Sequence, residues 1–182
     1  MPAKTTTAAA TFDMAFRLLE CVAAELAAAS DLGAPPRVLV SPGAEIAWDD
    51  CECGQLTVHT LRSYPSDKFP IIKQVGPFTQ CEATNTVVEY VVTILRCVPA
   101  SQDDGTPPDA AALTDASRQD HLDRWAVRRG VACCFEATDD PRAPTTRLIQ
   151  EQLAVGSEGL CMGSELHLFV AFPNCLTCQG AP

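Results

Sequence analysis

Three features that would place the chain in a common functional class are missing from its 182 residues. The longest apolar stretches are short and broken by charge, so we expect no membrane span. Met1–Ala10 is a run of Thr and Ala with one Lys, which lacks the pattern of a signal peptide. Thirteen Lys and Arg stand against 23 Asp and Glu, a net charge of −10. This balance argues against binding of nucleic acid through a basic patch.

Residues for catalysis and phosphate binding are also scarce. The three histidines, His59, His121 and His167, lack a recognisable nucleophile motif beside them. The glycines at 156, 159 and 163 do not follow the order of a phosphate-binding loop. Paired aspartates at 49–50, 103–104 and 139–140 adjoin turn residues, which is typical of solvated loops. We therefore predict neither an enzyme nor a bound cofactor.

Two helices are predicted from apolar spacing. The first covers Thr11–Ser30, with one apolar face made by Phe12, Phe16, Leu19, Val22 and Leu26. The second runs from Ala110 to about Val131, after Asp109 as its cap. Its predicted inward residues are Leu113, Ala116, Leu122, Trp125 and Ala126. Its predicted solvated face carries Arg118, Asp120, Asp123 and Arg128.

The remaining pattern predicts strands around these helices. Alternation indicates Gln55–Tyr64, Arg147–Val155 and Glu165–Phe172, and the apolar run of Val87–Val98 indicates a central strand. Val38–Val40 could add a short strand. The order helix-strand-strand-helix-strand-strand predicts an α+β fold with a mainly antiparallel sheet of about four strands. We expect a flexible segment at 1–10, one domain at 11–172, and a tail at 173–182. Long loops are expected at 66–83 and 99–109.

Cysteine is the compositional outlier, with ten residues in a chain that is 47% hydrophobic. Buried thiols, a zinc site and disulfides all remain open as explanations. Two closely spaced pairs could ligate zinc, namely Cys51 with Cys53 and Cys175 with Cys178. Cys21 and Cys97 lie inside predicted elements, where a small core residue is usual. Structural thiols or disulfides could involve Cys51, Cys53, Cys81, Cys97, Cys133, Cys134 and Cys161, and Cys51 or Cys53 could pair with Cys81 or Cys97.

An ordered set of short motifs resembles a known family. The set begins with Trp48-Asp-Asp-Cys-Glu-Cys-Gly-Gln-Leu56, followed by Tyr64-Pro-Ser66 and Phe69-Pro70. It continues with Tyr90, Leu95-Arg-Cys-Val-Pro99, Trp125, Arg128-Arg129, Cys133-Cys134, Gly159, Cys161 and Gly163. Together these are similar to head-to-tail connector proteins, the tail terminators, of long-tailed phages that infect actinobacteria. The match runs from about Trp48 to Phe172.

The resemblance implies a structural virion protein without a metal or cofactor. Tail terminators form a hexameric ring that caps the tail tube and meets the neck, or stopper, of the head. The resemblance therefore implies a homo-oligomer at the head-tail junction, assembled in the host cytoplasm away from membranes. An acidic lumen would let genomic DNA pass without specific binding. Unpaired sheet edges are candidates for ring closure.

Three alternatives stay open. Another neck ring, a stopper or an adaptor, would have the same location in the particle. A zinc-binding or thiol-dependent cytoplasmic protein belongs to a different class. An intracellular binding module could use the Cys51–Cys53 loop as a zinc knuckle.

Overall fold

The chain folds as a single α+β domain of two helices and a five-stranded sheet. The computed structural model describes residues 7–43, 54–73, 85–101, 104–135, 144, 146–158 and 160–173. The elements are α1 (Thr7–Ala29), β1 (Arg37–Val40), β2 (Gln55–Ser66), β3 (Asn85–Cys97), α2 (Ala110–Cys133), β4 (Thr146–Glu158) and β5 (Cys161–Pro173).

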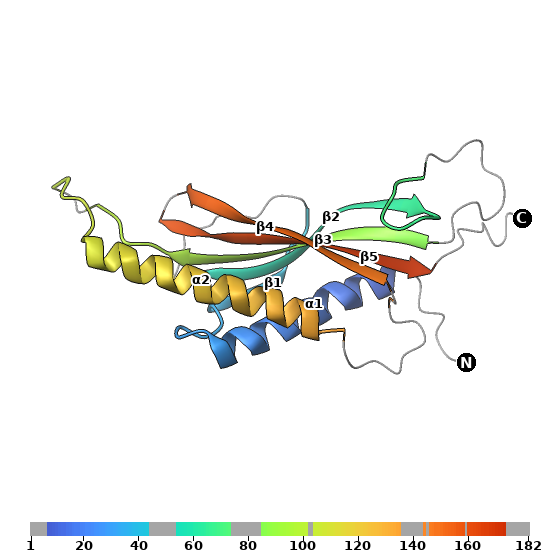
Figure 1. The fold of residues 1–182 in the computed structure, drawn as a ribbon, viewed down its shortest axis with the longest axis horizontal. Helices are drawn as coiled ribbons and strands as arrows, with labels where there is room; N and C mark the ends of the chain where they lie inside the picture. Colours follow the sequence, from blue (N-terminus) through green and yellow to red (C-terminus); the bar gives the residue numbers. More distant parts are fainter. Residues whose placement is uncertain are drawn as a thin grey trace, which may run out of the picture.

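The sheet has the strand order β1-β2-β3-β5-β4 (Figure 1). β1 pairs with β2 in parallel, while the three other pairings are antiparallel. The mainly antiparallel α+β prediction is thus confirmed, but five strands form rather than about four. The additional strand is β1, the short run at Arg37–Val40, which pairs with Gln55–Val58 of β2. A strand of four residues depends on its pairing with β2, so the sequence of these residues alone predicts it only weakly.

Both helices lie on the same face of the sheet (Figure 1). They run antiparallel, because Cys21 of α1 is bonded to Cys134 while Ser30 contacts Asp123. Gly130 lies at their closest approach. A β-carbon built there would lie 2.9 Å from the α-carbon of Val22, so the two backbones need a glycine at this position.

The main core fills the space between the helices and the sheet. It contains Leu18, Val22 and Leu26 of α1 together with Val127 and Val131 of α2. The sheet contributes the residues that face the helices, which are Leu56, Val58, Val88, Tyr90, Val92, Ile94, Leu166, Leu168, Val170 and Phe172. β3 is central, as predicted, and residues Val87–Leu95 are buried on both of its faces.

The predicted face of α1 is only partly correct. Leu19, Val22 and Leu26 are buried, but Phe12 and Phe16 are 58% and 48% exposed. Apolar residues occupy most positions around this helix, so the position of the sheet decides which of them are buried. The helix also begins at Thr7, within the segment that was expected to be flexible. Residues 1–6, and the expected tail beyond Pro173, lie outside the described residues.

The predicted faces of α2 are wrong at four positions. Leu113 and Trp125, expected inside, are 45% and 73% exposed. Asp120 and Asp123, expected in solvent, are 9% and 1% exposed. Apolar periodicity misleads here because ionic partners bury the acidic face of the helix. The predicted cap is confirmed, since Asp109 accepts a hydrogen bond from the backbone N–H of Ala112.

Candidate functional site

The outer edge of β4 is the longest sheet edge that the structure describes. β4 has 13 residues and pairs only with β5 among the described strands. Leu148 and Leu153 on this strand are 38% and 45% exposed. Its register shifts twice, after Ile149 and after Val155. An edge of this kind can accept another strand, although irregular register weakens such pairing.

The opposite edge is β1, which is only four residues long. Val38 on this strand is 39% exposed. The two edges therefore differ in length and in direction relative to their neighbours. A contact between them would be heterologous, which is the type of contact that closes into a ring.

The sheet face away from the helices carries a triad of Arg62, Glu89 and His167. Glu89 has a side chain only 5% exposed. One of its oxygens accepts a hydrogen bond from Arg62, and the other lies 2.8 Å from Nδ1 of His167. Arg62 also lies over the rings of Tyr64 and Phe169, at 5.5 and 5.7 Å from their centroids. The triad joins β2, β3 and β5 across the centre of the sheet.

Three unpartnered polar atoms lie on the same face of β2. They are Nε2 of Gln55, Oγ1 of Thr57 and Nδ1 of His59, all in buried residues with no hydrogen-bond partner. Burial lowers the pKa of His59, as does nearby His167, while the carboxylate of Glu165 acts in the opposite direction. Water is the simplest partner for such a row of buried polar atoms.

The chemistry available on this face is limited. A carboxylate that orients a histidine is one half of a general-base arrangement. Within the described ranges no hydroxyl or thiol hydrogen-bonds to His167, and the nearby Thr93 hydroxyl donates to Glu165 at 3.5 Å. The triad is therefore best explained as a structural hydrogen-bond network that holds three strands together.

A second network joins both helices to β3. The carboxylate of Asp123 accepts hydrogen bonds from Nε of Arg96 at 2.7 Å, the Ser30 hydroxyl at 2.6 Å and the Gln119 amide at 2.9 Å. Arg96 also donates to the carbonyl of Gly33 at 2.5 Å. A small cavity of about 60 Å³ adjoins this network. Because every polar group is matched by another, the network acts as an internal clamp.

The predicted pairings of Cys51 or Cys53 lie outside the described residues, whereas one disulfide that was not predicted joins the two helices. Cys21 is bonded to Cys134 across the helix pair, 113 residues apart in sequence, so its assignment as a plain core residue is wrong. Cys97 is exposed at the end of β3, so its assignment to the core is also wrong. Cys133 is exposed with a free thiol, and Cys161 is disulfide-bonded. Cys51, Cys53, Cys81, Cys175 and Cys178 lie outside the described residues.

No metal centre is formed by the residues that the structure describes. Within them, no group of three or more His, Cys, Asp or Glu side chains is placed to hold an ion. The four cysteines proposed as zinc ligands are not among these residues. In the same part of the chain, neither helix has the length and apolar character needed to cross a bilayer.

Sequence reasoning missed Glu89, Asp123 and the Cys21–Cys134 pair. One signal was available for Glu89, because a single carboxylate inside an apolar strand implies a buried partner. Asp123 gave no such signal, since it lies among other polar residues of α2. The disulfide gave none either, because ten cysteines allow too many pairings.

No protein-family model matches the chain, and no curated protein matches it at a significant level.

Proposed function

We propose that the chain is a structural protein of a phage particle, a tail terminator whose copies form a ring between tail tube and neck. The observation that carries the proposal is the long outer edge of β4, with two partly exposed leucines and no strand beyond it in the described sheet. An opposite edge of different length makes repeated head-to-tail contacts possible. The motif set described above supports the same assignment.

The charge of the chain fits a ring around DNA. A net charge of −10 repels phosphate, so DNA could pass through a lumen without being held. The segment after β2 exposes Ile71 and Ile72, at 58% and 52%. These residues belong to the loop predicted at 66–83 and are candidates for contact with the tail tube protein or the neck. The rest of that loop, from residue 74, lies outside the described residues.

The first test is the mass of the purified protein by light scattering, with negative-stain images of any large species. Six subunits in a ring are the expected result. A ring of twelve would favour another neck protein, a stopper or an adaptor. A protein that stays monomeric at high concentration and gives no cross-linked oligomers would contradict the ring proposal.

Parallel samples with chelator and with reductant distinguish a connector from a zinc-binding or thiol-dependent protein. A connector should lose stability or assembly in reductant and should be insensitive to chelator. A monomer with one zinc per chain, which unfolds when the zinc is removed, would instead favour a zinc-binding module.

A further inference from the structure

Two cysteines face each other across one end of the sheet. Cys97, the last residue of β3, is directly opposite Cys161, the first residue of β5, in the antiparallel register. Directly opposite residues of such a pair have their side chains on the same face. The backbone N–H of Val98 donates to the carbonyl of Leu160 at 2.8 Å, so the hydrogen bonds belong to the adjacent pair. Cys97 and Cys161 therefore form a non-hydrogen-bonded pair, the type whose side chains lie closer together.

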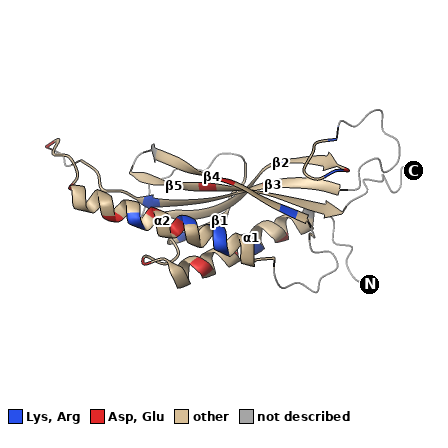
Figure 2. Ribbon diagram, in the orientation of Figure 1, with Lys and Arg blue, Asp and Glu red and all other residues tan. Residues whose placement is uncertain are grey.

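The spacing of this pair suits a disulfide. The α-carbons of a non-hydrogen-bonded pair are about 4.5 Å apart, within the range of about 4.4–6.8 Å that disulfides span. The backbone of Cys97 is held on both sides, by the hydrogen bond of Val98 and by Arg96. Acidic and basic residues are spread along α2 (Figure 2), and one of them, Asp123, accepts a hydrogen bond from Arg96 at 2.7 Å. A bond between Cys97 and Cys161 would therefore require no rearrangement of either strand.

The two cysteines differ in covalent state. Cys161 is disulfide-bonded. Its partner is not among the described cysteines, since Cys21 is bonded to Cys134 while Cys97 and Cys133 have thiols. The thiol of Cys97 is exposed, whereas Cys161 is 5% exposed. An accessible thiol thus lies beside one sulfur of an existing disulfide, which is the arrangement that thiol–disulfide exchange requires.

We propose that Cys97 takes over the disulfide of Cys161 by thiol–disulfide exchange, which joins β3 covalently to β5. The thiol of Cys97 gives its proton to solvent, and the thiolate attacks Sγ of Cys161. The new S–S bond forms as the old one breaks, and the former partner of Cys161 leaves as a thiolate that takes up a proton. One disulfide replaces another, so the step needs neither an oxidant nor a reductant.

The exchange gives the chain two covalent states. They differ in whether the end of the sheet is joined within itself or to another segment, and in which cysteine has the thiol. The step takes place within one chain, so it does not depend on the proposed ring.

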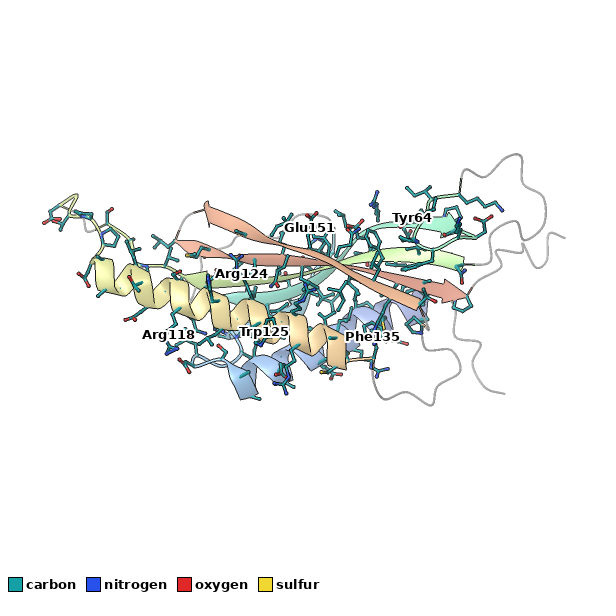
Figure 3. The ribbon with its side chains drawn as sticks, in the orientation of Figure 1. Tyr64, Arg118, Arg124, Trp125, Phe135 and Glu151 are labelled. Atoms are coloured by element: carbon teal, nitrogen blue, oxygen red, sulfur yellow. A yellow bond between two sulfur atoms is a disulfide. The ribbon has the colours of Figure 1, made fainter. Side chains whose placement is uncertain are left out.

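A second exposed thiol provides an internal control. Cys133 directly precedes the disulfide-bonded Cys134, but consecutive residues of a helix do not face each other. Cys133 lies at the end of α2, two residues before Phe135 (Figure 3). Cys97, in contrast, adjoins the first half of that helix, beside Ala116. We therefore expect Cys133 to remain a thiol under conditions in which Cys97 exchanges.

Disulfide mapping by mass spectrometry tests the exchange. The oxidised wild-type protein is kept without oxygen at about pH 8.5, near the usual thiol pKa, and is then acidified, alkylated and digested. We expect a peptide that links Cys97 to Cys161, together with an equal amount of one newly alkylated cysteine. At about pH 5 the link should form more than about 100-fold more slowly, because the thiolate fraction is smaller. Absence of the link at both pH values, a bond from Cys97 to a different cysteine, or equal exchange at Cys133 would overturn the proposal.

A matched variant moves the thiol by one residue. In the double variant Cys97→Ser, Val98→Cys the thiol occupies a hydrogen-bonded position on the other face of the sheet. We expect at least about ten times less linkage to Cys161 than in the wild type. Cys97→Ser alone should keep the original disulfide of Cys161. Equal linkage in the wild type and the double variant would show that the strand register does not direct the reaction.

Discussion

At the scale of single residues, two buried polar groups have well-defined and different environments. Asp123 is fully matched by Arg96, Ser30 and Gln119, whereas His59 has an unpartnered ring nitrogen. We expect the Asp123 carboxylate to stabilise the fold at neutral pH through these three partners. We expect His59 to make the free energy of unfolding depend on pH.

Removal of the Asp123 charge should destabilise the protein strongly. In Asp123→Asn the guanidinium of Arg96, 11% exposed, loses its only described carboxylate partner and remains buried as a charge. Breaking a buried pair on one side costs about 3–5 kcal/mol. Urea unfolding at neutral pH measures this loss.

The ion pair between Arg118 and Asp31 provides the control, because its side chains are 64% and 58% exposed. Asp31→Asn should change the free energy of unfolding by less than about 1 kcal/mol. A similar loss in both variants would show that Asp123 does not form the buried clamp described here.

His59 should make the protein less stable as the medium becomes acidic. Burial holds the pKa of His59 below the usual value of 6.5, so near and below that value the unfolded chain binds the proton more tightly than the folded one. Stability from this group is therefore complete above about pH 6.5 and falls as the pH falls towards the lowered pKa.

The contribution of His59 can be isolated by comparing wild type with His59→Gln in urea unfolding between about pH 8 and pH 5. The variant should show a smaller loss of stability on acidification. Identical pH profiles would mean that His59 ionises equally easily in both states.

At the scale of elements, the helix pair is joined by bonds spread along its length. The disulfide of Cys21 and Cys134 lies at one end, and the contacts of Ser30 and Asp31 with α2 lie at the other. These bonds hold α1 beside α2, and both helices cover the same face of the sheet. The disulfide is the only covalent bond between helices that the structure describes.

Removal of this disulfide should lower stability considerably in oxidising buffer. The bond closes a loop of 113 residues, for which the chain-entropy model gives about 4–5 kcal/mol. The double variant Cys21→Ser, Cys134→Ser should lose a large part of this energy in urea unfolding. In reductant the wild type and the variant should unfold alike, because the disulfide of Cys161 is then reduced in both.

Cys133→Ser is the matched control, since it replaces the neighbouring exposed thiol. It should unfold like the wild type with and without reductant. If reductant leaves the wild type unchanged, the disulfide does not contribute to stability.

At the scale of the whole molecule, the two sheet edges are the surfaces through which copies could form the proposed ring. These edges, β1 and β4, lie on opposite sides of the sheet (Figure 1).

A lysine on the β4 edge should prevent ring formation without unfolding the subunit. Leu153→Lys places a charge at a partly exposed position of the edge strand, where it opposes pairing with another strand. We expect the mass by light scattering to fall from the ring to smaller species. Leu61→Lys, at a position 38% exposed on the inner strand β2, should keep the ring. Rings in both variants would remove β4 from the contact.

The element order was accessible from the sequence because each main element carries a local pattern. Alternation identified β2, β4 and β5, and the apolar run identified β3 as central. Asp109 was recognised as a cap for α2 because capping depends on residues only three apart. The short β1 was the least defined element, since four residues carry little pattern.

The faces of the helices and the buried charges required the tertiary structure. Phe12, Phe16 and Trp125 are large apolar residues that local periodicity assigns to the core, yet the sheet and the second helix leave them exposed. Asp123 is polar and local periodicity assigns it to solvent, yet Arg96 from a distant strand buries it. Of the cysteines predicted as structural thiols or disulfides, Cys134 and Cys161 are disulfide-bonded, but the bond of Cys134 to Cys21 was not among the pairings considered.

The sequence by itself determined the class of fold, the strand order along the chain, the acidity, and the lack of an apolar run that could cross a membrane. These depend on composition and on neighbours within a few residues. Only the tertiary structure decided which of ten cysteines are bonded, which carboxylates are buried and which tryptophan is exposed. Those outcomes depend on contacts between residues up to 113 positions apart, and no local pattern encodes such contacts.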